Sequence, residues 1–80
     1  MRMFDEDNKK NIDTLTLLLE EAEVSQLISY LNALISGNDK KAHFHMNNED
    51  YSKEITLALY DVNDINHFSD RYKKLILEDE

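Results

Sequence analysis

A chain of 80 residues with a net charge of −8 has room for one small core. Because it has no cysteine, no disulfide or thiolate metal site can support that core. The absence of cysteine favours a cytoplasmic location. Its acidic balance excludes nucleic acid and anionic lipid as favoured partners and favours a basic protein. No apolar run approaches the roughly 20 residues of a membrane span, and self-association into a homodimer is the most available way to stabilise so small a fold.

The first predicted strand follows a polar N-terminal segment. Residues 1–12 carry equal numbers of acidic and basic side chains, and we expect a tail there and a single domain over 13–80. From Asp13 to Leu19 the pattern alternates, with threonines on one face and leucines on the other, which predicts a strand. Leu18 breaks the alternation, and the leucines could instead extend the next helix backwards.

A long amphipathic helix is predicted over residues 20–36. Its apolar residues recur at the spacing of one helix face, and we expect all of them to pack on a sheet: Val24, Leu27, Ile28, Leu31, Leu34 and Ile35. The acidic residues at its start suit the positive end of the helix dipole. Gly37, the only glycine, is expected to end the helix in a left-handed conformation. The substitution Leu31→Asp should then unfold the domain, because it buries an unpaired charge.

Two further strands are predicted after the helix. Residues 42–46 alternate, and so do residues 54–62, with the polar loop 47–53 between them, which is typical of an antiparallel hairpin. We expect the strand at Asp13–Leu19 to lie beside the last of these. The fold class is therefore α+β, a three-stranded mainly antiparallel sheet in a β-α-β-β order with the long helix on one face.

A short C-terminal helix completes the predicted fold. Asn63 and Asp64 are good N-cap residues, and apolar residues follow them at helical spacing: Ile65, Phe68, Tyr72, Leu75 and Ile76. An extended strand over Tyr72–Leu77 is the alternative for residues 64–77. The chain has no proline that would mark the end of an element and so decide between helix and strand.

His43 and His45 form the one pattern that suggests metal chemistry. Two residues apart on a strand, they point to the same side at roughly 6.6–7 Å and could share one ion. A third ligand would have to come from His67, Asp61 or Glu49, and nothing in the sequence brings any of these near. We therefore predict no metal and no cofactor, with both imidazoles facing water or a partner.

No catalytic arrangement is recognisable in the sequence. There is no nucleophile elbow or other triad pattern, and a single glycine cannot build a phosphate-binding loop. The paired carboxylates lie where surface acids ordinarily lie. We predict that the chain has no catalytic residues and is not an enzyme.

The run LTLLLEEAEVSQLISYLNALISG, followed by HFHM and then EITLALY, resembles the immunity protein 32 family of bacterial polymorphic-toxin systems. The resemblance covers about Leu15 to Tyr60, and its most specific part is His43–Met46. Members of that family commonly carry a Trp-Gly-Gly-like stretch before the last strand, where this chain has NNEDYSK. A function that depends on that loop is therefore in doubt.

The resemblance implies a protein that binds and neutralises a cognate toxin. A basic toxin domain suits the acidic chain, because complementary fields speed association. We expect the following residues to line the contact: Glu20, Glu21, Glu23, His43, His45, Glu49 and Asp50. The alternative is a homodimeric regulatory or accessory interaction module, which predicts self-association without a toxin.

Overall fold

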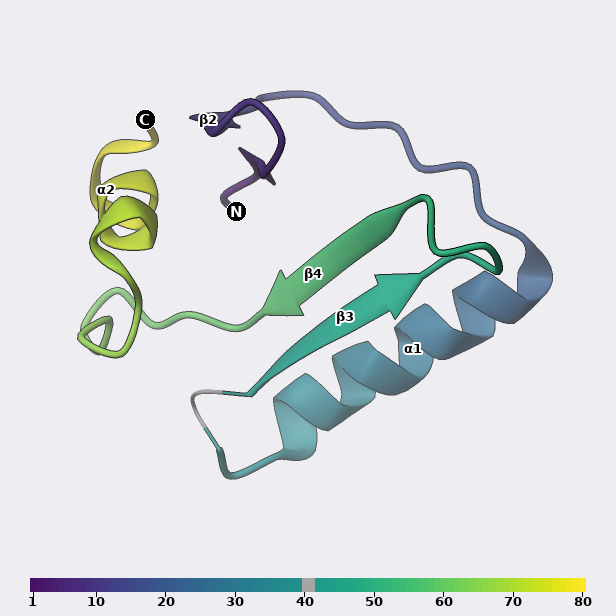
Figure 1. Cartoon of the computed structure of the whole chain (residues 1–80). Coiled ribbons are helices and arrows are strands. Elements are labelled where there is room, and N and C mark those ends of the chain that lie inside the picture. The colour runs from purple at the N-terminus through teal and green to yellow at the C-terminus, as the bar shows by residue number, and fades with distance from the viewer. Residues whose placement is uncertain (40–41) are drawn as a thin grey trace. The chain divides into compact units, whose positions relative to one another are not determined.

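The computed structural model describes residues 1–39 and 42–80, and these residues divide into two compact units (Figure 1). The central unit runs continuously from Leu18 to Tyr60. The terminal unit combines the two ends of the chain, Met1–Leu17 and Asp61–Glu80. The boundary between these units does not coincide with residue 12, where the polar tail was expected to end.

Helix α1 of the central unit spans Glu21–Ser36 and confirms the predicted long helix. It begins after Glu20, whose backbone N–H donates to Oε1 of Glu23 at 2.9 Å, one half of a capping box. The left-handed conformation expected for Gly37 is wrong, because its φ is −74°. A Cβ at Gly37 would lie 2.7 Å from the carbonyl oxygen of Ala33, so close approach to the helix end, and not positive φ, requires the glycine.

The predicted hairpin is present in the central unit. Strand β3 spans His43–Asn47 and strand β4 spans Glu54–Ala58. They pair antiparallel, and the register sets His45 opposite Thr56 and Met46 opposite Ile55. Helix α1 runs along one face of this hairpin (Figure 1).

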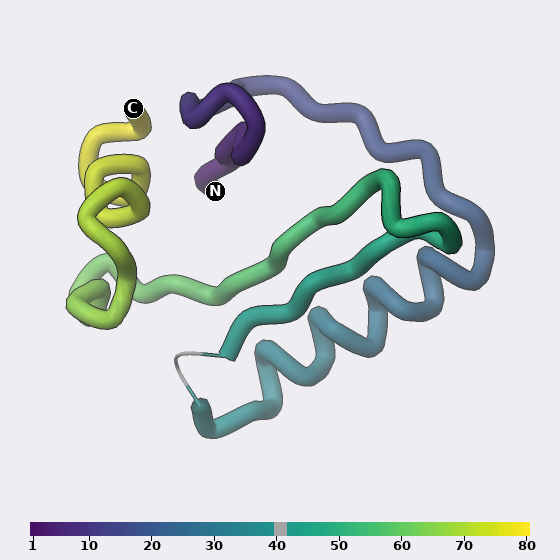
Figure 2. The backbone as a smooth tube through the Cα atoms, viewed as in Figure 1, coloured from purple at the N-terminus to yellow at the C-terminus, as the bar shows by residue number. Residues whose placement is uncertain are grey.

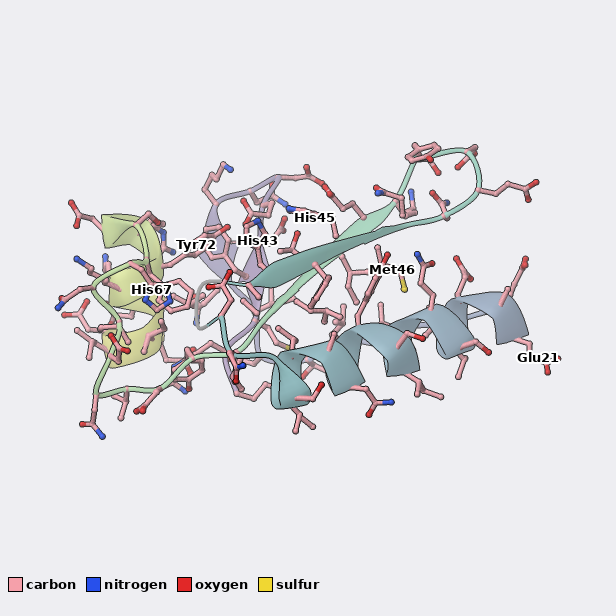
Figure 3. The ribbon with its side chains drawn as sticks, turned by 90° about the horizontal axis from the view of Figure 1, so that it is seen from below. Glu21, His43, His45, Met46, His67 and Tyr72 are labelled. Atoms are coloured by element: carbon pink, nitrogen blue, oxygen red, sulfur yellow. The ribbon has the colours of Figure 1, made fainter. Side chains whose placement is uncertain are left out.

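The core of the central unit lies between the hairpin and α1. Met46 is only 3% exposed, and the Tyr30 ring stacks on the Phe44 ring with their centroids 5.0 Å apart. Figure 3 shows Met46 pointing toward α1, while His43 and His45 project from the opposite face of β3. The strand alternation read from the sequence is therefore correct for β3.

The apolar stripe of α1 divides into two rows. The row nearer the hairpin includes Leu27, Tyr30 and Leu34, which are half-buried. The second row is exposed: Val24 by 41%, Ile28 by 54%, Leu31 by 44% and Ile35 by 80%. The expectation that all six stripe residues pack on the sheet is wrong for this second row. Two strands about 4.8 Å apart form too narrow a surface to cover both rows of a helix about 10 Å wide.

The predicted three-stranded sheet is corrected by the structure, because Asp13–Leu19 forms no strand. The structure instead holds two separate two-stranded antiparallel sheets in the described residues. Leu15, Leu17 and Leu18 are exposed. Alternation shows which side chains share a face of an extended backbone, whereas a strand also needs a neighbour for its hydrogen bonds. Neither strand pairing of the described residues includes this segment.

The terminal unit is built from both ends of the chain (Figure 2). Strands β1, Phe4–Asp5, and β2, Lys10–Asn11, pair antiparallel. Arg2 ties this hairpin to the C-terminal helix, because its Nε donates to the carbonyl oxygens of Leu75 at 3.0 Å and Ile76 at 3.1 Å. Residues 1–12, where a polar tail was expected, are therefore part of the terminal unit, because Arg2 bonds to residues at the other end of the chain.

Helix α2 spans Asp70–Glu78 and confirms the C-terminal helix over the alternative strand. It begins later than Asn63 and Asp64 suggest. Ser69 is its N-cap, since the Ser69 hydroxyl accepts a hydrogen bond from the backbone N–H of Tyr72. Leu75 and Ile76 are the buried residues of α2, and the Tyr72 ring meets the Phe4 ring edge-on at 5.7 Å.

Candidate protein-binding site

An acidic groove lies at the N-terminal end of α1, within the central unit. Its volume is about 560 Å³, and it is lined by Glu20, Ala22, Glu23, Gln26, Asn47, Asn48, Glu49 and Asp50. Four of the seven residues predicted to contact a partner line this one groove. Two come from the start of α1 and two from the loop after β3, so the fold brings together acids that lie far apart in sequence. No Lys or Arg is among the lining residues.

Hydrogen bonds within the β3–β4 loop order it and hold the Asp50 side chain. The Asn48 amide nitrogen donates to the Ser52 hydroxyl at 3.0 Å, and the Lys53 backbone N–H donates to Asn48 Oδ1 at 2.9 Å. The Ser52 hydroxyl and backbone N–H both donate to Asp50 Oδ1, at 2.7 and 3.1 Å. These bonds lower the pKa of the Asp50 carboxyl, chiefly through the Ser52 hydroxyl, so Asp50 is charged at neutral pH.

Tyr51 stands at the tip of this loop, and sequence reasoning missed it. Its side chain is 78% exposed, and its backbone is left-handed, with φ 60°, a conformation that costs a residue with a Cβ roughly 1–2 kcal/mol. A large exposed aromatic next to charged residues is typical of protein contacts. The polar run NNEDYSK predicts a loop, but it does not show that the loop presents this ring.

The remaining three predicted contact residues lie outside the groove. Glu21 lies in the first turn of α1 and is exposed, and Figure 3 shows it at the end of the helix. His43 and His45 are on the outer face of the hairpin, their ring centroids 5.1 Å apart. The seven residues therefore do not form one continuous site.

His45 is held by neighbours on β4. Its Nδ1 lies 3.0 Å from Oε1 of Glu54 and 2.9 Å from the Thr56 hydroxyl. The Thr56 hydroxyl can both donate and accept, so the direction of its hydrogen bond with Nδ1 follows the imidazole tautomer. Among residues 1–39 and 42–80, no three His, Cys, Asp or Glu side chains are grouped so that they could hold a metal ion. Both imidazoles are thus exposed on one face of β3, and His45 has polar neighbours on β4.

The chain was compared with protein families, curated proteins and solved structures. No protein-family model, curated protein or solved structure matches the chain. The resemblance to immunity proteins therefore rests on the residues quoted above. Neither helix in the described part of the chain has the length and apolar character needed to cross a membrane.

Proposed function

We propose that this chain is a protein-binding module whose acidic groove recognises a basic surface on a partner protein, and that the partner is the toxin domain implied by the family resemblance. The observation that carries the proposal is the convergence of carboxylates from α1 and from the β3–β4 loop on one groove. The proposed function is binding without catalysis, and the proposed location is the cytoplasm. A chain without cysteine suits that reducing compartment, because it needs no disulfide.

The groove offers a basic partner two kinds of interaction. Its carboxylates accept charge-assisted hydrogen bonds from Lys or Arg, which are stronger than those between neutral groups. The net charge of −8 adds a long-range field that raises the rate of encounter with a positive surface. Tyr51, beside Asp50 in sequence, supplies an aromatic side chain that a partner can cover.

The hydrogen-bonded loop favours binding for an entropic reason. A loop that is already ordered loses less conformational freedom when a partner docks. The bonds of Asn48 and Ser52 within the loop provide this order before any partner arrives. This loop is also where the chain departs from the family pattern, so it is the part of the site expected to determine which partner is accepted.

The test is a calorimetric titration of the chain with the basic protein encoded beside its gene. We expect the triple variant Glu20→Gln, Glu23→Gln and Glu49→Gln to weaken binding about tenfold, because each exposed ion pair contributes roughly 0.2–1 kcal/mol. Glutamine keeps the capping-box geometry at residue 23. We also expect the dissociation constant to rise with salt concentration, since salt screens exposed charges.

The matched control is the triple variant Asp7→Asn, Glu78→Gln and Glu80→Gln. It changes the net charge by the same amount, but its residues belong to the terminal unit. It should leave the dissociation constant within about twofold, because none of its three residues lines the groove. Equal losses in the two triple variants, or a neighbouring gene that encodes no basic protein, would contradict the proposal.

A further inference from the structure

The exposed row of α1 is an unusual surface for this chain. Val24, Ile28, Leu31 and Ile35 lie on one side of the helix and remain 41–80% exposed. Residues 24–38 contain no charged side chain, although 32% of the chain is charged. A helix face that meets only water normally carries charges, whereas the centre of a protein interface is depleted in them.

We infer that this row is where a second copy of the chain docks, by packing α1 antiparallel against its own counterpart. The inference goes beyond the proposed function, because the row does not line the acidic groove. Three features of the described residues select a second copy as the occupant: the spacing of the apolar residues, the placement of the charges and the size of the surface.

The spacing is the same when the helix is read in either direction. Successive members of the row are four, three and four residues apart. A two-fold axis at the middle of the row therefore places Val24 of one copy against Ile35 of the other, and Ile28 against Leu31. Every apolar side chain then meets an apolar side chain, which is the self-complementarity that a two-fold interface requires.

The charges favour the antiparallel arrangement over the parallel one. All acidic residues of α1 lie in its first turn, at Glu21 and Glu23. A parallel pair would bring these carboxylates together, and like charges repel. An antiparallel pair places the first turn of each copy beside the last turn of the other. The two acidic turns are then separated by most of the helix length, at about 1.5 Å per residue, and the two helix dipoles are opposed.

The size of the surface indicates a weak, reversible dimer. Four partly exposed aliphatic side chains per copy form an interface below the standard size of about 1,600 Å². The central unit also has few other supports, since compact units near 40 residues usually need a disulfide, a metal or a partner, and the chain has no cysteine. Covering the exposed row of α1 supplies such a support.

The first test is sedimentation equilibrium of the full chain over a wide concentration range. We expect a monomer–dimer equilibrium with a dissociation constant on the order of 10 µM, as suits a small interface. Dimerisation should tighten as salt is raised, because two copies each carrying −8 repel one another at long range. This salt response is opposite to the one expected for the basic partner, so the two proposals fail separately. A chain that stays monomeric at every concentration and salt level overturns the inference.

Charge-swap variants distinguish loss of the interface from loss of the fold. Ile28→Lys with Leu31→Lys, and separately Ile28→Glu with Leu31→Glu, should each be monomeric, because like charges then face one another across the axis. An equimolar mixture should form a heterodimer. Leu77→Lys, at an exposed apolar residue of α2, is the control and should leave dimerisation unchanged. If the mixture stays monomeric while both variants keep their circular dichroism, the row is not the interface.

The orientation has its own test in a chain that lacks native cysteine. Val24→Cys mixed with Ile35→Cys should give a disulfide-linked dimer under mild oxidation, whereas Val24→Cys alone should not. Bridging needs Cα atoms within about 7 Å, and the antiparallel pair brings residue 24 that close only to residue 35. Cross-linking of Val24→Cys alone, without the mixed product, would show a parallel pair and overturn the inference.

Discussion

At the scale of single residues, Tyr51 shows stability and binding set against each other. Its left-handed backbone suits glycine or asparagine better than tyrosine, and its ring is mostly exposed, so it contributes little to packing. A residue that costs the fold free energy and is still presented to solvent is more easily explained by contact with a partner than by structure.

Tyr51→Asn should therefore raise stability and lower partner affinity. We expect the free energy of unfolding to rise by about 1 kcal/mol, since asparagine tolerates the left-handed region, and binding to weaken severalfold. Thermal melting and calorimetry measure the two effects. The control is Lys9→Asn, because Lys9 also has a positive φ, 56°, and lies in the terminal unit. It also removes the ion pair of Lys9 with Glu6, and it should leave affinity unchanged. A Tyr51→Asn variant that binds as well as the native chain would remove Tyr51 from the site.

Glu6 and Tyr72 form a pair whose effect on stability depends on pH. The Tyr72 hydroxyl donates to the Glu6 carboxylate. This bond, with smaller contributions from burial and the Glu6 charge, raises the pKa of Tyr72 to about 12. The same hydrogen bond is the main cause that lowers the pKa of Glu6 from its ordinary 4.5. The pair thus links the β1–β2 turn to α2.

We expect the terminal unit to lose stability at both extremes of pH. Because the pKa of Tyr72 is raised, its contribution is complete below pH 10 and is lost as the pH rises toward 12. Because the pKa of Glu6 is lowered, its contribution is complete above pH 4.5 and is lost below it. Ultraviolet titration of the tyrosines measures the first effect. Glu6→Gln should bring the pKa of Tyr72 back toward 10, and Asp7→Asn should not. An unchanged Tyr72 titration in Glu6→Gln would contradict the pairing.

At the scale of elements, α1 shows what periodicity can and cannot tell. The i, i+3, i+4 spacing correctly predicts the helix, and its acidic first turn correctly predicts where it begins. Six apolar residues at that spacing can all pack on one wide surface, or they can form two rows that pack on different surfaces. The two rows of α1 are about 100° apart around the helix axis, so both arrangements are possible. Only the width of the surface opposite the helix decides between them, and that depends on how many strands pair.

Leu27 and Leu31 should therefore respond differently to the same substitution. Leu27→Asp places a charge in the half-buried row beside the hairpin and should unfold the central unit, because burying an unpaired charge costs several kcal/mol against a total stability near 5 kcal/mol. Leu31→Asp, on the exposed row, should keep its helical circular dichroism and lose dimerisation. Unfolding of Leu31→Asp at micromolar concentration would restore the original expectation that both rows lie in one core.

The segment Asp13–Leu19 illustrates the limit of strand prediction. Its residues alternate as far as Leu17, yet of the two segments only β3 is paired with another strand in the described part of the chain. Strand formation is a property of two segments, and a single segment shows only half of the requirement. The β3–β4 pair was predictable because its partners lie close in sequence, joined by a loop of turn-forming residues.

At the scale of the whole molecule, local features were predictable and distant associations were not. The α+β class, both helices and the hairpin follow from patterns within about 20 residues. The terminal unit depends on Arg2 reaching Leu75 and on Phe4 meeting Tyr72, pairs that no periodicity connects. The acidic groove is intermediate, because charge indicated Glu20 and Glu49 as contact residues, and only the packing of α1 on the hairpin shows that they line one surface.

The terminal unit has a consequence for how the chain acquires its structure on the ribosome. Every residue of the central unit is synthesised before residues 61–80. Arg2 must wait for Leu75 and Ile76 to emerge before it can donate to their carbonyl oxygens. At roughly 5–20 residues per second this delay lasts seconds. Residues 1–17 thus fold only after the central unit has been synthesised, and a chain that ends after Tyr60 would lack the partners of Arg2 while keeping every residue that lines the acidic groove.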